Sequence, residues 1–309
     1  MERLLRRVPG FALGAIECRL DEADSQVDLS FRLSHAAQAR AFKRLLGPRY
    51  LIDFLESWSL EKDPRIPFLW LEFDLDQEPG EELHPFLLAK LSGRTEADWL
   101  AESLVPRMQA GPVSKDQRTL IARSLAALPV EASPTYISTL KARGQKTVRF
   151  DHYGLTPKKM GDYLRLLGRR DLAEALADPA ELLSETDQFH LSHDFASQIE
   201  PRLGVEGSFA QGVLPKLSRW QRLLCRLTDA GLCSPAKRDA VLAWVGYDSP
   251  SSVPGLWPEA CRDLGGFMVR SLSHVKIICH PEKPPEAKVY LLFGQYLRSS
   301  RGSLVLRDR

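Results

Sequence analysis

The chain has 309 residues, of which 44% are hydrophobic and 27% are charged. That apolar fraction is enough to bury a substantial core, so intrinsic disorder is excluded as the main state. The 42 Lys and Arg residues nearly balance the 40 Asp and Glu residues, and the net charge of +2 argues against nucleic acid as an obligate partner.

The cysteines and the first residues bear on location. Five cysteines stand at positions 18, 225, 233, 261 and 279, and no two have the CxxC spacing of a zinc or redox site. We interpret them as reduced thiols of a cytosolic protein. Residues 1–10 are basic but lack the apolar segment of a signal peptide, and no apolar run approaches the roughly 20 residues that cross a bilayer. The sequence predicts a cytoplasmic protein without a membrane partner.

Strand-like segments occur in pairs along the chain. Residues 27–33 alternate strictly between apolar and polar, which is typical of a strand with one face in a core. The third pair meets across Gly144-Gln145, a dipeptide suited to a type II′ hairpin turn. The five predicted pairs are 15–20 with 27–33, 68–74 with 86–91, 135–143 with 146–153, 188–195 with 202–209, and 275–280 with 287–294.

Helical segments separate these pairs. Ser34 is a good N-cap for a helix that extends to about residue 58, and Ser114 with Gln117 predicts a capping box. Thr156-Pro157 predicts an N-cap followed by proline at the first helical position. Further helices are predicted from residue 95, over 214–244 with a break at Gly231, and near 259–272 after a loop-rich stretch.

Five hairpins joined by helices fit two kinds of fold. One is an arbitrary α+β protein, or two smaller sheets. The other is a closed ten-stranded antiparallel β-barrel surrounded by helices, built from αββα repeats. Two arguments favour the barrel, because closure removes the edges that a long open sheet exposes, and the helices then cover the outside with their apolar stripes.

Helices on the outside would leave the polar face of each strand for the lumen. On residues 27–33, for example, Leu29 and Phe31 would pack under helices, and Asp28, Ser30 and Arg32 would face inward. The same rule places these residues inside: Glu17, Arg19, Trp70, Glu72, Asp74, Arg149, Asp151, Tyr153, Arg202, Gly204, Glu206, Ser208, Lys276, Lys288 and Tyr290.

This set of residues indicates a particular chemistry. Cations gathered in a cavity with low-dielectric walls suit an anion such as diphosphate. Aromatic rings beside them would shield a carbocation by cation–π attraction, and a carboxylate would accept a proton from an acceptor group.

The arrangement resembles the aromatic prenyltransferases of the ABBA type, whose PT-barrel consists of five repeats of helices and antiparallel hairpins. The likeness covers almost the whole chain and lies in architecture and residue pattern. It implies a single prenyltransferase-like barrel domain over residues 1–309. It also implies transfer of an allylic prenyl group, as from dimethylallyl diphosphate, to an aromatic small molecule or a peptide side chain.

The resemblance also suggests residue roles. Glu17 looks like the family's glutamate that hydrogen-bonds the nucleophilic acceptor, with Glu72 as the competing candidate. Trp70 and Glu206 would contact the acceptor. The segment Lys288-Val-Tyr290 is the best single match to the family's diphosphate cage. The full cage would comprise Arg32, Lys90, Arg149, Tyr153, Arg202, Lys276, Lys288 and Tyr290.

Other interpretations stay open at this point. The chain has no Asp-Asp-x-x-Asp cluster, so the sequence implies no magnesium requirement, and Mg²⁺ binding is left undecided. His190 and His193 have a spacing that suits a metal only on a helix, whereas a strand directs the two rings to opposite faces. A non-catalytic protein that binds a peptide or another ligand in the same cavity is the main alternative, and a transferase or lyase on an unrelated α+β fold is a third.

Overall fold

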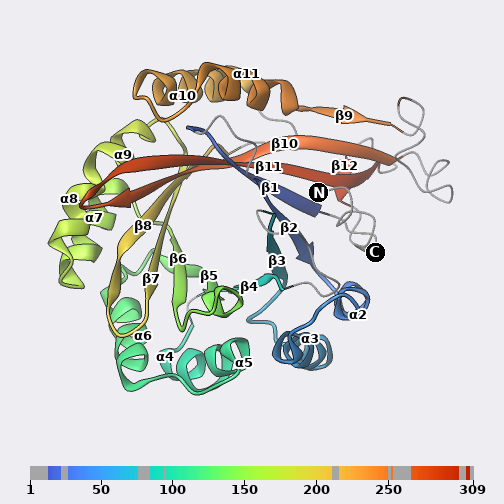
Figure 1. Cartoon of the computed structure of the whole chain (residues 1–309), viewed down its shortest axis with the longest axis vertical. Helices are drawn as coiled ribbons and strands as arrows, with labels where there is room; N and C mark the ends of the chain where they lie inside the picture. Colours follow the sequence, from blue (N-terminus) through green and yellow to red (C-terminus); the bar gives the residue numbers. More distant parts are fainter. Residues whose placement is uncertain are drawn as a thin grey trace.

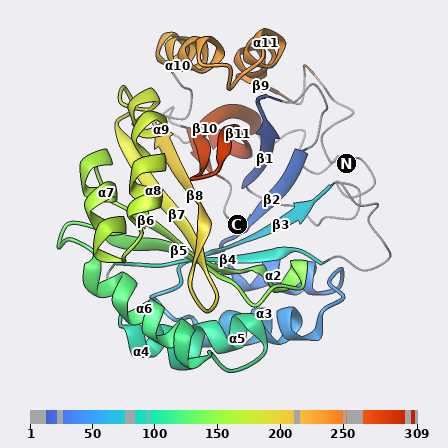
Figure 2. The same cartoon turned by 60° about the vertical axis from the view of Figure 1, so that its left-hand side comes forward.

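A computed structural model of the chain describes residues 13–21, 27–75, 84–93, 95–210, 216–249, 252, 266–298 and 304–306. The strands of this part form one antiparallel sheet that closes into a ten-stranded barrel, and the helices stand on its outside (Figure 1, Figure 2). The closed barrel confirms the fold class predicted from the paired strands, and it excludes an open sheet or two smaller sheets.

The barrel strands follow one another in chain order. They are β1 (Leu13–Arg19), β2 (Val27–Leu33), β3 (Leu69–Asp74), β4 (Phe86–Lys90), β5 (Ser133–Thr139), β6 (Val148–Tyr153), β7 (Gln188–Phe195), β8 (Ile199–Ser208), β10 (Gly266–His280) and β11 (Lys283–Arg298). Strand β11 pairs with both β10 and β1, which closes the ring. Two short strands lie outside it: β9 (Gly246–Asp248) pairs with β10, and β12 (Leu304–Leu306) pairs with β11.

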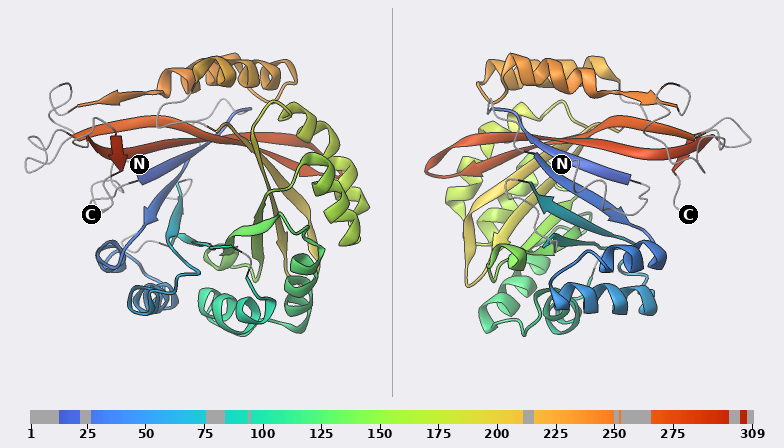
Figure 3. Two further views of the ribbon diagram at one scale, coloured as in Figure 1. Left: turned by 180° about the vertical axis from the view of Figure 1, so that it is seen from behind. Right: turned by 45° about the vertical axis from the view of Figure 1, so that its right-hand side comes forward.

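Helices connect each hairpin to the next. They are α2 (Ala36–Lys43), α3 (Arg49–Glu61), α4 (Ala97–Trp99), the π-helical turn Leu100–Leu104, α5 (Val105–Gln109), α6 (Lys115–Ala127), α7 (Pro157–Leu166), α8 (Arg170–Ala175), α9 (Ala177–Leu182), α10 (Leu217–Asp229) and α11 (Pro235–Trp244). Helices α10 and α11 lie over β10 and β11, on the side of the barrel away from α3 and α5 (Figure 3). No helix in the described ranges is long and apolar enough to cross a membrane.

Local sequence signals start several helices as predicted. Ser114 and Gln117 form the reciprocal capping box of α6. The Thr156 side chain accepts a hydrogen bond at the start of α7, and Ser234 does the same for α11, each followed by proline at the first helical position. These caps satisfy amide groups that have no partner within the helix.

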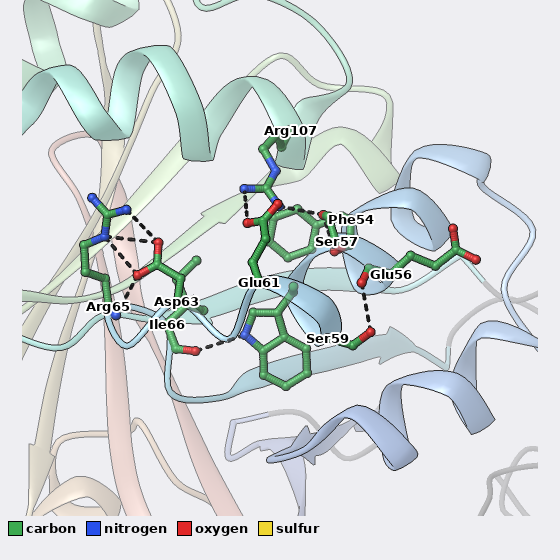
Figure 4. Close-up of polar contacts among 10 residues, drawn as sticks. Phe54, Glu56, Ser57, Ser59, Glu61, Asp63, Arg65, Ile66 and Arg107 are labelled. Atoms are coloured by element: carbon green, nitrogen blue, oxygen red, sulfur yellow. Dashed lines mark hydrogen bonds and ion pairs between the residues drawn. The ribbon is translucent and has the colours of Figure 1, made fainter.

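Polar contacts also fix α3 against its neighbours. The Trp58 indole Nε1 donates to the Ile66 carbonyl at 2.9 Å, which ties α3 to the approach to β3. From α5, the Arg107 guanidinium donates to Ser57 Oγ at 2.6 Å and pairs with Glu61 at 3.0 Å (Figure 4). The helices on this side are therefore held to one another as well as to the barrel.

The hydrophobic core lies between the barrel wall and the helices. Leu29, Phe31 and Leu33 of β2 are buried, and the Phe31 ring lies 5.8 Å from the Phe42 ring of α2. On the opposite side, the Phe209 ring contacts the Trp220 ring of α10 at 5.0 Å. On β2 the apolar face thus points outward, which leaves Asp28 and Ser30 of the polar face for the interior.

Two predicted elements near the start and middle of the chain are wrong in detail. The helix predicted over 34–58 is two helices: α2 ends at Lys43, and Pro48, whose ring prevents a continuous helix through this position, is the N-cap of α3. The third hairpin has no two-residue turn at Gly144-Gln145. Strand β5 ends at Thr139, and a 3₁₀ turn over Leu140–Arg143 leads to Gly144, whose φ is +72°.

The largest error concerns the last hairpin. The helix predicted near 259–272 is wrong over 266–272, which belong to β10, while 259–265 lie outside the described residues. Strand β10 pairs with β11 along its length, and that pairing overrides the local helical pattern. Both strands are longer than predicted, and β11 contains Pro284 and Pro285, whose side chains are exposed near the hairpin turn.

Candidate active site

The barrel interior holds two adjacent cavities lined by inward-facing side chains. The first, which we call the polar compartment, has a volume of about 190 Å³. Its wall carries five acidic and five basic side chains: Glu17, Asp28, Glu72, Asp74, Asp194, Arg19, Arg149, Arg202, Lys276 and Lys288. The net charge of this wall is therefore close to zero.

The second cavity, the aromatic compartment, has a volume of about 460 Å³. Apolar and aromatic side chains make up much of its wall: Leu13, Ala15, Leu88, Val269, Leu292, Trp70, Tyr136, Phe209, Tyr290 and Tyr296. Four residues line both cavities, namely Glu72, Arg149, Lys276 and Tyr290. We call this shared boundary the junction. The lumen is thus charged at one end and largely apolar at the other.

Glu17 is held by two residues of the neighbouring strand. Because Glu17 lies opposite Tyr290 in the β1–β11 register, the Tyr290 hydroxyl donates to one carboxylate oxygen and the Lys288 ammonium to the other. Burial alone would raise the pKa of Glu17, but Lys288 and Tyr290 outweigh it and lower the pKa to about 2. Glu17 is therefore ionised and fixed in position.

A second ion pair joins the adjacent strands β8 and β10, where Glu206 and Lys276 are opposite in the register. The Lys276 ammonium lies 2.8 Å from a Glu206 oxygen, and the His274 Nε2 lies 3.6 Å from the other. Burial favours the neutral form of His274 and lowers its pKa to about 4, so this imidazole is uncharged at neutral pH. Its ring stacks on Tyr290 with centroids 4.0 Å apart, which links this ion pair to the Glu17 cluster.

Arg149 forms the third ion pair, with Asp194 of the adjacent strand. The guanidinium binds the carboxylate through two hydrogen bonds of 2.6 and 2.9 Å, because the two residues are opposite in the β6–β7 register. Burial opposes ionisation of Asp194, yet Arg149 outweighs it and the pKa of Asp194 is lowered. Three of the six cations that were predicted to hold an anion, Arg149, Lys276 and Lys288, are therefore already paired with carboxylates.

Of the twelve residues that the sequence assigned to catalysis, to the diphosphate cage or to the acceptor, seven line the polar compartment and two line only the aromatic one. The first group is Glu17, Glu72, Arg149, Arg202, Lys276, Lys288 and Tyr290, and the second is Trp70 and Glu206. The barrel thus brings together both predicted catalytic carboxylates, both predicted acceptor contacts and five of the predicted cage residues.

The remaining three cage candidates lie apart from that group. The Arg32 Nε donates to Ser34 at 2.9 Å, and the Lys90 ammonium lies 4.8 Å over the Tyr136 ring. Tyr153 is 39% exposed and packs against the His190 ring. Each of the three stands within one residue of the end of its strand, where the helical connections begin, and none lines either cavity.

Sequence reasoning missed two residues of the lumen. His274 faces the interior because it lies two residues from Lys276 on β10, whereas the sequence predicted a strand only from Val275 and a helix up to Leu272. Asp151 was predicted to face inward but was given no role, although its 6% exposure and its place in the aromatic compartment make it part of the site.

One group of carboxylates has the spacing of a cation site. Ligand oxygens of Glu17, Asp28 and Glu72 lie within 4.8 Å of one another, and hard cations such as Mg²⁺ prefer oxygen ligands. Among the described residues, these three carboxylates would hold such an ion in the polar compartment. His190 and His193 cannot do so together, because one ring lines the lumen and the other is buried against α7.

Comparison with solved structures identifies the fold. The 5-dimethylallyl tryptophan synthase from Streptomyces coelicolor, in complex with DMASPP and Trp, superposes with a TM-score of 0.50 over 91% of this chain and 78% of that one, at 14% identity. This chain has the PT-barrel fold. A second structure of the Streptomyces synthase matches the PT-barrel at a TM-score of 0.45, 12% identity and coverages of 91% and 80%. The apo form of the prenyltransferase PriB matches with a TM-score of 0.49 and 12% sequence identity, over 91% of this chain and 79% of that one.

The likeness to these enzymes is one of fold. No family model matches the sequence of this PT-barrel, and no curated protein matches it. The arrangement of hairpins and helices that the sequence resembled is therefore present, while the chemistry of the lumen must be judged from its own residues.

Proposed function

We propose that this PT-barrel is an aromatic prenyltransferase. It transfers an allylic prenyl group from a prenyl diphosphate to an aromatic small molecule or a peptide side chain. The observation that carries the proposal is the division of one closed lumen into a cation-bearing polar compartment and an adjoining aromatic compartment. That the similar Streptomyces synthase was solved with DMASPP and Trp supports a prenyl donor and an aromatic acceptor.

The donor's diphosphate would occupy the polar compartment. Lys276 and Lys288 are each ion-paired, with Glu206 and Glu17, whereas Arg202 at the exposed rim has no ion pair in the described ranges. Diphosphate binding would therefore proceed by exchange, in which diphosphate oxygens replace carboxylates as partners of the two ammonium groups. The same exchange frees one Glu17 oxygen, beside the junction residue Tyr290, to accept a hydrogen bond from the N–H or O–H of an acceptor that reaches the junction.

Bond cleavage would follow from this placement. The C–O bond of the donor breaks with its electron pair going to the diphosphate, whose charge the lysines and Arg149 stabilise. The allylic cation forms at the junction, where the electron-rich face of Tyr290 attracts it, with Trp70 nearby in the aromatic compartment. The acceptor ring in the aromatic compartment then supplies the electrons of the new bond.

The direct test is product formation. We expect the protein to add one prenyl group to an acceptor from a panel of indoles, phenols and Trp- or Tyr-containing peptides, with dimethylallyl diphosphate as donor and mass spectrometry as the readout. Lys288→Ala should reduce turnover at least about 100-fold, because it removes a cation at the leaving group. Lys158→Ala, on the exposed face of α7, is the matched control and should leave turnover unchanged. A lack of product with every acceptor and with geranyl diphosphate as well would contradict the proposal.

The charge balance of the polar compartment favours a second candidate, a non-catalytic protein that binds a peptide or ligand in the lumen. A wall with equal numbers of acidic and basic groups suits a zwitterionic ligand at least as well as a trianion. Calorimetric titration separates the two. Binding of dimethylallyl diphosphate that weakens in Lys288→Ala supports the enzyme, whereas peptide binding without diphosphate binding or turnover supports the alternative.

A further inference from the structure

Asp151 differs from the other carboxylates of the aromatic compartment. Glu206 is ion-paired with Lys276, and Glu72 also has an electrostatic partner. Asp151 lines the same cavity and is only 6% exposed, yet no donor in the described ranges makes a hydrogen bond or an ion pair with its carboxylate. A buried carboxylate without a direct partner destabilises a fold, so its presence calls for a functional reason.

The position of Asp151 relative to the junction suggests that reason. On β6, Asp151 is two residues from Arg149, and both side chains point into the lumen. Arg149 and Lys276 line both compartments, whereas Asp151 lines only the aromatic one. A donor carbon attached to a diphosphate in the polar compartment would meet the acceptor ring at the junction. Asp151 therefore lies on the acceptor's side of the new bond.

The surrounding charges leave Asp151 able to gain a proton. Burial is the main cause that raises the pKa of Asp151, to about 6. Glu206 and Asp194 also raise this pKa, whereas Lys276 and Arg149 lower it. Tyr136, opposite Asp151 in the β5–β6 register, is uncharged at neutral pH because burial raises its own pKa to about 12. Glu17 and Glu206 have pKa values of about 2, so they hold a proton far less readily.

We propose that Asp151 is the proton acceptor of the transfer reaction, an inference that rests on the proposed function. After the donor's C–O bond has broken and the ring carbon of an indole acceptor has formed the new C–C bond, the C–H bond at that carbon breaks. Its electrons return to the ring, which restores aromaticity, and its proton goes to the Asp151 carboxylate. The proton then leaves with the diphosphate, which restores the ionised side chain.

His274 fits this role less well than Asp151. Its Nδ1 lies 2.9 Å from Ser273 Oγ and its Nε2 faces Glu206, so both ring nitrogens already have polar neighbours. Its stacking on Tyr290 also fixes the ring plane against the barrel wall. Asp151 lines the same cavity and has neither constraint.

The test compares Asp151→Asn with the unaltered protein, using an indole acceptor deuterated at the ring carbon that reacts. We expect Asp151→Asn to lower kcat about 100-fold with little change in KM, because the side chain keeps its size but cannot accept the proton. A primary isotope effect on kcat should appear or increase, because proton removal becomes the slow step. The pH profile of the unaltered protein should rise through about pH 6, and that rise should be absent in the variant. Asp151→Glu should restore part of the activity.

Stability gives an independent readout. Because its pKa is raised, the ionised Asp151 disfavours the folded state, so Asp151→Asn should increase Tm at pH 7.5. Asp162→Asn, an exposed carboxylate on α7, should change neither activity nor the isotope effect. An active protein whose Asp151→Asn variant keeps its kcat, isotope effect and pH profile overturns the role of Asp151 while the proposed function stands. A protein that is inactive with every donor and acceptor overturns both.

Discussion

Strands β6 and β7 carry polar residues on both of their faces, and these residues are neutral on the outer face and charged on the inner face. On the outer face, the His152 and His193 Nε2 atoms lie 3.2 Å apart, and the Tyr163 hydroxyl lies 3.0 and 2.9 Å from them. On the inner face, Arg149 and Asp194 form a two-point ion pair. All of these side chains are largely or completely removed from solvent.

The difference follows from what surrounds each group. Outside the barrel, the imidazoles lie beside Phe150 and Phe195. Burial lowers the pKa of His193 to about 4, so this imidazole is uncharged at neutral pH. Inside, Arg149 supplies a counter-charge, and Asp194 stays ionised although it is buried. The single β-sheet of the barrel wall can therefore separate a neutral core, under the helices, from a charged lumen. The outer polar groups are neutral parts of the core, whereas the inner ones keep their charge and are available for the proposed reaction.

The largest effect is expected where the inner face loses a counter-charge. Lys276→Ala leaves Glu206 buried without its ammonium partner, which should cost about 3 kcal/mol of unfolding free energy and reduce turnover by about 100-fold or more. Urea unfolding and the prenylation assay measure the two effects. Lys276→Met combined with Glu206→Gln should recover much of the stability but none of the activity. Full recovery of activity in the double variant would contradict an ionic role for this pair.

His193, on the outer face, should make the free energy of unfolding depend on pH. His193 has an ordinary pKa of 6.5 when unfolded and about 4 when folded, so the unfolded chain takes up the proton first as pH falls. Its stabilising contribution is complete above pH 6.5, and about 2 kcal/mol of it should be lost by pH 4.5.

Asp151 acts in the opposite sense within the same range. Its folded pKa of about 6 is above the ordinary 3.8, so the folded chain gains a proton first and is stabilised as pH falls. In urea unfolding from pH 7.5 to 4.5, the free energy of unfolding of Asp151→Asn should therefore fall more steeply with pH than that of the unaltered protein. Equal slopes would contradict the opposite shifts of the two faces.

Two glycines of β8 give the smallest and most closely matched comparison. A Cβ at Gly204 would lie 2.3 Å from Lys276 Cε in the lumen, and one at Gly207 would lie 2.8 Å from Thr186 Oγ1 on the outer side. We expect Gly204→Ala to displace Lys276 and reduce turnover about 10-fold, equivalent to about 1.4 kcal/mol. Gly207→Ala should lower Tm and leave turnover intact. The reverse pattern in activity assays and thermal melts would show that the two faces have been assigned wrongly.

The sequence predicts the barrel and its inner face well where alternation is regular. On β2 the apolar residues Leu29 and Phe31 face the helices, and Asp28 and Ser30 line the lumen, as expected. Such a strand has one dry and one wet face, so its period of two is visible without a partner. The same reasoning places Glu17 inside correctly.

Two features of the site were not predictable because they depend on neighbouring strands. The inward position of His274 was missed because β10 extends through this residue only by pairing with β8 and β11, whereas the preceding residues have a local helical pattern. The lack of a direct partner for Asp151 follows from register, because Asp194 lies opposite Arg149 and takes its guanidinium, whereas Ser192 lies opposite Asp151. Charge pairing across strands thus requires a register that a single sequence does not reveal.

The closing contact between β11 and β1 has a consequence for how the protein is made. Residues separated by more than 250 positions, such as Glu17 and Lys288, must meet before either compartment has a complete wall. During synthesis, the early hairpins can pair with each other, but the cavity is enclosed only after β11 has left the ribosome. This topology has a high contact order and predicts slow maturation, with a nascent chain that has no enclosed lumen until its last barrel strand is in place.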